Sequence, residues 1–385
     1  MSQLYFSKDK INQSYLGKNE VKTPTFKELI PNYLSYEWDT SKQTESSVRI
    51  NDTTFTFTES PVFVTMDELG IKDVTSFHSM FGFYLGGNNP KGAGITKLEQ
   101  LPQSSKVKHF GNMFRYQSGL TSVDLRKMDT SSANYLTYMF SGSSNIEEVN
   151  ISGWDTSNVT NINGCFGGLT DVKELDVSSW NTSKVTTCVK LFEGCISLES
   201  LDLSSWDMSN VTVSQNMTNM FSNCSSLREL KYFKKVSNLS DWTIASLGLT
   251  SLLKLDVTAL DTSEMTSLTA FFNGCRNLTS LDVSNFNTSN VTDMYKMFAD
   301  CSSLGLLDLS GWDTSNVTNI QFLMADCTSL HRVDLSGWDL TNCSNTIMPF
   351  NNCPALTEIY MRGCNQDTID KIKMYAPANA TIITE

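Results

Sequence analysis

The sequence has little positive charge, little histidine and little proline. Its 385 residues include 29 Lys and Arg against 41 Asp and Glu, so the formal net charge is −12, and there are 3 His and 8 Pro. Nucleic acids are bound through clustered Lys and Arg that neutralise phosphates, so we expect no nucleic-acid partner. Zinc sites need closely spaced Cys and His, and the sequence contains no C-x-x-C pair, so we expect no zinc site and assign no metal ligands.

Long apolar runs and enzyme motifs are missing as well. No stretch reaches the roughly 18 apolar residues of a membrane-spanning helix, and residues 1–22 lack the apolar segment and cleavage site of a secretory signal, so we expect neither in this chain. No G-x-S-x-G, H-E-x-x-H or phosphate-binding glycine loop is present. The sequence therefore predicts a protein that is not an enzyme and has no cofactor. An enzyme alternative would place its site where the repeat described below is interrupted, at 213–249 or 83–94.

What is present is a repeat of 26 residues. Seven apolar–Asp–apolar triplets mark its register, and they begin at Val123, Leu175, Leu201, Leu255, Leu281, Leu307 and Val333. Three further columns keep the same period: Phe from Phe114 to Phe350, Trp or Phe from Trp154 to Trp338, and Cys from Cys195 to Cys353. Four columns in phase do not arise by chance, so the chain is a tandem array whose neighbouring units share one core.

Within one repeat, two kinds of apolar spacing follow one another. The triplets alternate apolar and polar residues, which indicates a short strand with one buried face. The stretch Val291–Cys301 has apolar residues at 291, 294, 297, 298 and 301, a spacing typical of a helix. We therefore predict an α/β repeat solenoid of the leucine-rich-repeat kind, with short parallel strands on one face and short helices on the other.

The pattern divides the chain into three parts. Residues 1–68 are predicted to be an attachment segment or small β unit, because 48–50 and 54–58 alternate like strands around a turn at Asn51 and Asp52. Residues 69–366 form the solenoid, with a glycine-rich loop at 83–94 inserted in its degenerate first turn. Residues 367–385 leave the repeat and are predicted to cap its C-terminal end.

The cysteine and tryptophan columns each have a structural and a functional interpretation. Without an export signal the ten cysteines are expected to be free thiols, stacked as buried apolar side chains. Disulfides between adjacent turns are the alternative, although each Cys would then compete with two neighbours. The Trp and Phe column is expected to pack between turns, and an exposed platform for sugars is the alternative.

The aspartates of the triplets are the candidate binding residues. They are Asp124, Asp176, Asp202, Asp256, Asp282, Asp308 and Asp334. Stacked carboxylates about 5 Å apart repel one another, so the column needs a reason. One explanation is local: each carboxylate accepts hydrogen bonds from Ser, Thr or main-chain groups nearby. The other is a strip that binds cations or a basic partner.

The consensus L-x-x-L-D-L-S-x-W-D-T-S-N-V-T-x-M-x-x-M-F-x-x-C resembles the BspA-type leucine-rich-repeat surface proteins. The match is best at 278–301 and 304–327 and extends from about Val74 to Tyr360. The resemblance implies a solenoid used for adhesion and protein recognition, on bacterial surfaces or in viruses that infect bacteria.

A short N-terminal segment, Ile11 to Val21, is similar to one found in bacteriophage tail and particle proteins. Together with the missing export signal, it favours a bacteriophage virion component: a tail, fibre or decoration protein. In that hypothesis residues 1–68 bind other virion proteins, and the solenoid meets a host surface protein or glycan. The alternatives are a bacterial cell-surface adhesin and an intracellular protein-binding module, and a homo-oligomer is left open.

Overall fold

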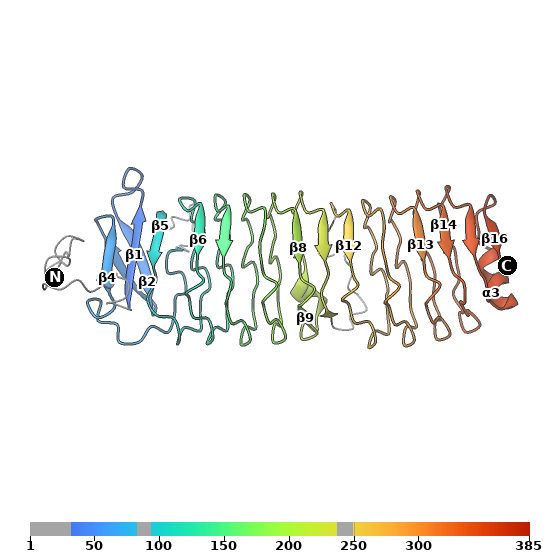
Figure 1. Cartoon of the computed structure of the whole chain (residues 1–385), viewed down its shortest axis with the longest axis horizontal. Coiled ribbons are helices and arrows are strands. Elements are labelled where there is room, and N and C mark those ends of the chain that lie inside the picture. The colour runs from blue at the N-terminus through green and yellow to red at the C-terminus, as the bar shows by residue number, and fades with distance from the viewer. Residues whose placement is uncertain (1–31, 83–93, 237–248, 250) are drawn as a thin grey trace, which may run out of the picture.

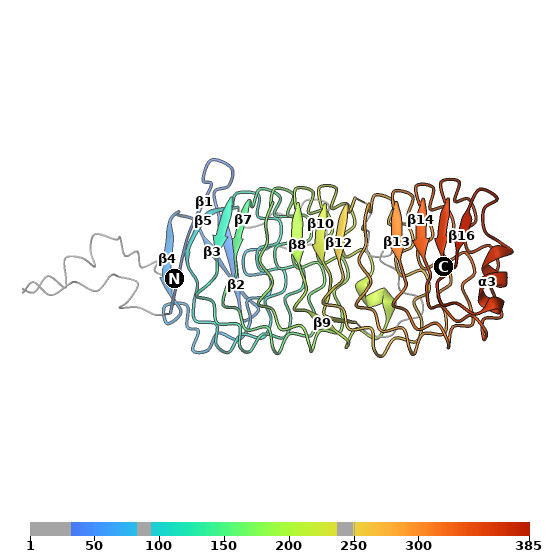
Figure 2. The same cartoon turned by 45° about the vertical axis from the view of Figure 1, so that its right-hand side comes forward.

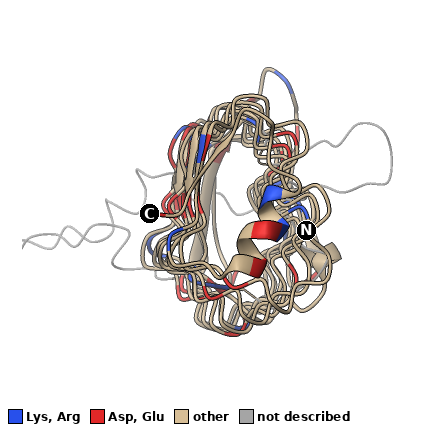
Figure 3. Ribbon diagram, turned by 90° about the vertical axis from the view of Figure 1, so that its right-hand side faces the viewer, with Lys and Arg blue, Asp and Glu red and all other residues tan. Residues whose placement is uncertain are grey.

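The computed structural model describes residues 32–82, 94–236, 249 and 251–385, which form a β-solenoid of about ten turns. Successive turns stack along one axis into an elongated body, with the N-terminal strands at one end and α3 (Gln366–Lys373) at the other (Figure 1). Seen along this axis, the successive turns overlie one another (Figure 3). The predicted stacking of 26-residue units into one continuous core is confirmed.

Short parallel strands occupy one side of the coil. They are β6 (Ser122–Asp124), β7 (Glu148–Asn150), β8 (Ser200–Asp202), β10 (Glu229–Lys231), β12 (Lys254–Asp256), β13 (Leu306–Asp308), β14 (Arg332–Asp334), β15 (Glu358–Tyr360) and β16 (Thr381–Ile383). In β8, β10 and β12 the central residues Leu201, Leu230 and Leu255 are Cα partners. The apolar column therefore stays in register from turn to turn, as the triplets predict.

The short helices predicted for the other side are wrong in the described turns. In the stretch 291–301, the N–H groups of Met294, Lys296 and Phe298 donate to carbonyls of the next turn at 2.8–3.1 Å. The N–H groups of Met297 and Ala299 close tight turns onto the residue three positions back, and that of Tyr295 donates to Asp293 Oδ1 at 2.8 Å. Lys296 and Asp300 have φ of 54° and 62°. Left-handed residues at this spacing stop a helix. The apolar side chains still point inward, because repeated tight turns bury residues at intervals of three and four.

Helical structure in the described residues is limited to α3 and the single 3-10 turn Ser214–Met217, which follows β9 (Asp207–Met208). β9 pairs in parallel with β11 (Lys235–Val236) of the next turn. The fold is therefore a β-solenoid, and the α/β expectation does not hold for it. Residues 83–93, 237–248 and 250, where an enzyme alternative would have placed much of its site, lie outside the described residues.

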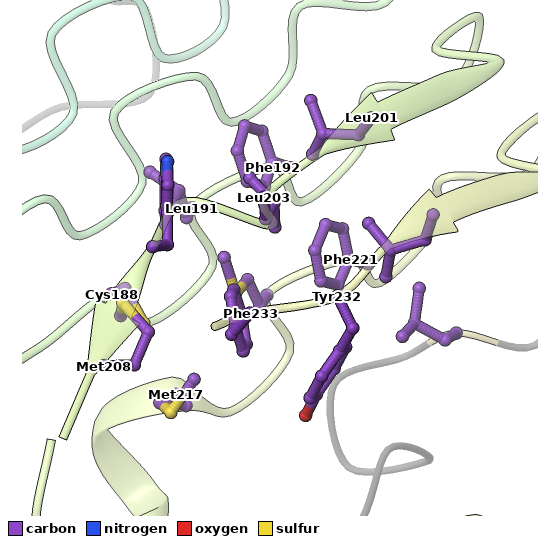
Figure 4. Close-up of a cluster of buried hydrophobic side chains, with 14 of the residues drawn as sticks. Cys188, Leu191, Phe192, Leu201, Leu203, Met208, Met217, Phe221, Tyr232 and Phe233 are labelled. Carbon is purple, nitrogen blue, oxygen red and sulfur yellow. The ribbon is translucent and has the colours of Figure 1, made fainter. Parts of the chain in front are cut away.

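Aromatic side chains fill the core as stacks that run along the axis. The rings of Phe114 and Phe140 lie 5.5 Å apart at 6°, and those of Trp180 and Trp206 lie 5.8 Å apart at 0°. Figure 4 shows the same packing at Phe192 and Phe221, which come from successive turns. The Trp and Phe column is buried, so its packing interpretation is confirmed and the sugar platform is not present there.

The ten cysteines are free, nine of them buried and Cys364 partly buried. Burial raises the pKa of Cys275 and Cys224 to about 12 and of Cys353 to about 11. These thiols are protonated at neutral pH. The expectation of free, buried thiols is confirmed.

The N-terminal strands join directly to the first turns. β2 (Ser46–Ile50) and β3 (Thr53–Phe57) form the expected hairpin, and its turn residues Asn51 and Asp52 have φ of 48° and 64°. β1 (Tyr33–Trp38) lies between β4 (Val62–Thr65) and β5 (Ile95–Gln100), antiparallel to both. β5, the strand expected for the first turn, thus pairs with the N-terminal unit. The predicted boundaries at 68 and 366 stay predictions, and residues 1–31 lie outside the described residues.

The C-terminal end is covered by α3 and β16. Asn365 caps the helix by accepting a hydrogen bond from the Thr368 N–H at 2.8 Å, and Ile369 and Ile372 are buried under it. β16 adds a last parallel strand to β15, and Figure 2 shows both elements at the end of the stack. No helix in the described part of the chain is long and apolar enough to cross a membrane.

Candidate functional site

The predicted Asp column lies on the outer surface of the strands. Leu307 and Val333 point into the core, whereas the next residues, Asp308 and Asp334, are Cα partners that face outward. Five members of the column are exposed and two are half-buried; the exposed ones are Asp124, Asp176, Asp256, Asp282 and Asp308, and the half-buried ones are Asp202 and Asp334. The structure therefore brings the seven residues onto one face.

Each of these carboxylates caps the turn that follows its strand. In all seven, Oδ1 accepts a hydrogen bond of 2.9–3.2 Å from the N–H two residues later, the geometry of an Asx turn. Hydrogen bonds from Ser284 hold the pKa of Asp282 below its usual value. Each of the seven carboxylates thus makes a hydrogen bond within its own turn, as the local explanation of the column predicts. Binding of cations or of a basic partner stays a prediction.

Basic side chains relieve part of the repulsion along the column. The hydrogen bond from Arg126 lowers the pKa of Asp124 to about 2, and the two groups pair at 2.7 Å. Lys231 occupies the column position between Asp202 and Asp256. Its Nζ lies 2.7 Å from Asp202 Oδ2. In the described residues no group of three or more His, Cys, Asp or Glu has the arrangement of a metal site.

A second surface, which the sequence did not identify, lies on the part of each turn that returns to the next strand. We call it the return face. It consists of the outward side chains around isolated parallel bridges such as Ser267–Asp293 and Asp293–Asn319. One of its columns contains left-handed residues at every described turn: Ser79, Asn112, Tyr138, Gly164, Lys190, Asn219, Ala270, Lys296, Phe322 and Met348, with φ between 47° and 58°.

Bulky residues in this column are unusual. Gly164 and Asn112 adopt left-handed φ readily, whereas Phe322 and Met348 do so at a cost of about 1–2 kcal/mol each. Gly164 shows that the fold accepts the smallest residue there. The larger side chains point outward, so the core does not explain them.

Phe322 and Met348 belong to a surface group that we call the return-face patch: the half-buried Tyr295, Lys296 and Phe322 and the exposed Ile347 and Met348. The Lys296 Nζ lies 5.2 Å from the ring centroid of Tyr295 and 5.8 Å from that of Phe322. The two rings meet edge to face at 6.4 Å. Ile347 and Met348 are 44% and 47% exposed. The patch thus combines aromatic, aliphatic and cationic groups over three turns.

A smaller group of the same kind lies nearer the N-terminus. The guanidinium of Arg115 is 4.8 Å from the ring centroid of Tyr116 and 5.1 Å from that of Tyr138. The Tyr138 ring lies directly over Gly164 of the next turn. The sequence does not point to these residues, because the apolar spacing of this segment predicts a helix there. The available signal was a column that mixes Gly and Asn with Tyr, Phe and Lys at the 26-residue period.

The repeat, the stacked turns and the strand register together define a solenoid of the leucine-rich-repeat type. A family described as "Mycoplasma protein of unknown function, DUF285" matches residues 95–174, 136–246 and 244–361. These matches span more than half of the chain, so the protein belongs to this family. No curated protein matches the chain in sequence.

Three solved structures show a weak likeness to the chain. An internalin of Listeria monocytogenes is 13% identical, with 85% of each chain covered and a TM-score of 0.28. A leucine-rich-repeat protein of Leptospira interrogans is 12% identical, covering 72% of this chain and 84% of its own, with a TM-score of 0.27. The pneumococcal vaccine antigen PcpA is 13% identical over 88% and 87%, with a TM-score of 0.29. At these TM-scores the three add no argument about function.

Proposed function

We propose that this chain is a non-enzymatic binding protein of the adhesin type, which recognises a protein on another cell through its return face. The observation that carries the proposal is the left-handed column, where bulky Phe322 and Met348 stand at positions that Gly or Asn would occupy at lower cost. Strain of this kind concentrates at functional sites. A binding role explains why bulky side chains occupy these positions.

The composition of the return-face patch favours a protein partner. Aromatic residues and Met are enriched in protein interfaces, and a few such side chains supply most of the binding energy. The exposed Ile347 and Met348 extend the apolar part beyond Phe322. A patch spread over three stacked turns presents these groups on a rigid support, which limits the ordering cost of binding.

The non-enzymatic part of the proposal is supported by the state of the thiols. Burial raises the pKa of Cys224 to about 12, and Cys224 donates to the Phe192 carbonyl at 3.1 Å. Such a thiol is neither ionised nor accessible to a substrate. The triplet carboxylates are engaged in capping turns.

For its location, we favour the surface of a bacterial cell over a virion. The resemblance to BspA-type surface proteins and the membership of a family described from Mycoplasma support this choice. The virion hypothesis depends on the segment Ile11 to Val21, which lies outside the described residues.

The test compares attachment of protein-coated beads to cultured cells. The variant Phe322→Asn with Met348→Asn removes the apolar groups and places Asn where left-handed φ is favourable. We expect it to lose at least tenfold in bound beads while its Tm stays unchanged or rises. Leu306→Thr is the matched control, because Leu306 is an apolar side chain on the strand side that is 54% exposed. Equal attachment of the double variant and the wild type would refute the proposal.

A further inference from the structure

A cavity of about 760 Å³ opens at the N-terminal end of the return face, between the β2–β3 hairpin and the first two turns. The hairpin is held against the first turn by Asn51, whose Oδ1 accepts hydrogen bonds from the N–H groups of Thr75 and Ser76 at 2.7 and 3.0 Å. The Arg49 N–H also donates to the Met80 carbonyl at 2.9 Å. The hairpin wall of the cavity is therefore fixed by hydrogen bonds to the main chain of the first turn.

The cavity exists because a small residue occupies one position of a stacked column. Ser76, His109 and Tyr135 are parallel bridge partners in successive turns. The rings of His109 and Tyr135 stack at 4.9 Å and 10°. Ser76 has no ring to continue the stack, so the second face of the His109 imidazole is turned toward the cavity that both residues line.

The cavity is cationic in a chain whose net charge is −12. Arg49, Lys106 and Lys108 line it together with one carboxylate, Asp52, and Lys106 pairs with Asp73 beside the cavity at 2.5 Å. Arg49 Nη2 pairs with Asp52 at 2.8 Å, while its Nε is buried without a hydrogen-bond acceptor in the protein. Lys108 is the lining cation that remains without an ion-pair partner among the described residues. Burial, and then the positive charge of Arg49, lower the pKa of His78 in the same wall.

We propose that this cavity binds an acidic sugar unit of a glycan, with its sulfate or carboxylate held by Lys108 and Arg49 and its ring packed on the free face of His109. Cationic side chains bind such anions through charge-assisted hydrogen bonds. An aromatic face provides an apolar surface for the sugar ring. This site does not depend on the return-face patch and takes a different class of ligand, so either proposal can fail alone.

The test measures binding of the full chain to a fluorescent heparin hexasaccharide and to an unsulfated oligogalacturonate by anisotropy. We expect at least one of them to bind, and binding to weaken as salt rises. Lys108→Gln is expected to lower the affinity about five- to tenfold, and His109→Ala by a similar factor. The control is Lys173→Gln, which makes the same charge change at an exposed lysine on the strand side.

Three outcomes would overturn the inference. The first is the absence of binding to both saccharides. The second is an equal effect of Lys108→Gln and Lys173→Gln, which would mean that only net charge matters. The third is competition by a poly-glutamate peptide at the same concentration as the glycan, which would assign the cavity to acidic proteins. Thermal melting of each variant separates loss of binding from loss of fold.

Discussion

The Sγ atom of Cys301 lies 3.2 Å from the main-chain oxygen of Phe272 in the preceding turn and donates a hydrogen bond to it. The same contact recurs from Cys327 to Phe298 at 3.1 Å, and Ser143 makes it to Phe114 at 2.5 Å. The column thus combines a small side chain that fills the core with a donor that joins adjacent turns.

The buried thiols predict a loss of stability at alkaline pH. Their pKa values are raised in the folded chain, to about 12 for Cys275, whereas an unfolded thiol titrates near 8.5. The contribution of these protonated thiols to the free energy of unfolding is therefore fully present below about pH 8.5. It is lost as pH rises further, by up to about 1.4 kcal/mol per pH unit for each thiol. Urea unfolding at pH 7, 9 and 10 measures it.

The control for this prediction is a variant with Cys275, Cys301 and Cys327 changed to Ser, since Ser143 shows that the column accepts a hydroxyl. We expect a smaller fall in the free energy of unfolding between pH 9 and 10 than in the wild type. Identical slopes would show that other groups cause the alkaline loss.

The role of the Asp column in capping turns predicts that replacing one aspartate by Ala lowers stability more than replacing it by Asn. Asp308 accepts from the Ser310 N–H at 3.0 Å, and an Asn side chain can do the same. Asp308→Ala should therefore lower the free energy of unfolding by about 1 kcal/mol, and Asp308→Asn by clearly less. Urea titration of both variants measures the difference.

A combined Asp282→Asn and Asp308→Asn variant separates the two interpretations of the column. If the carboxylates serve only as turn caps, partner binding is indifferent to calcium, to salt and to this variant. Calcium-dependent or salt-dependent binding that the variant abolishes would establish the strip for cations or a basic partner.

The ion pair between Asp124 and Arg126 predicts a loss of stability at acid pH. The hydrogen bond from Arg126 lowers the pKa of Asp124 to about 2, so its stabilising effect is present above the unfolded pKa of about 3.9. That effect is lost as pH falls from about 4 to 2. Arg126→Gln should raise the pKa of Asp124, measured by the pH dependence of its carboxyl carbon shift in NMR. An unchanged titration would mean that the ion pair is not formed in solution.

Two glycines test the close approach of turns on the return face. A Cβ at Gly164, where φ is +56°, would lie 2.4 Å from the Tyr138 ring, whereas at Gly153, with φ +86°, nothing lies within 4 Å. Gly153→Ala should lower the free energy of unfolding by about 1 kcal/mol, because Ala is strained at this positive φ. Gly164→Ala should cost at least 1 kcal/mol more. Equal Tm values for the two variants would contradict the packing of Tyr138 over the next turn.

The 26-residue period, the buried Phe, Trp and Cys columns and the hairpin turn at Asn51 and Asp52 were all determined by the sequence, because burial and turn preference depend on local residue type. The tertiary structure decided where main-chain hydrogen bonds go. Met294 and Lys296 donate to the next turn and not along a helix, and apolar spacing alone cannot distinguish these cases. It also decided that β5 pairs with β1 and that Ser76 leaves the face of His109 open. Such relationships depend on which turn becomes the neighbour, so they arise only once the coil has stacked.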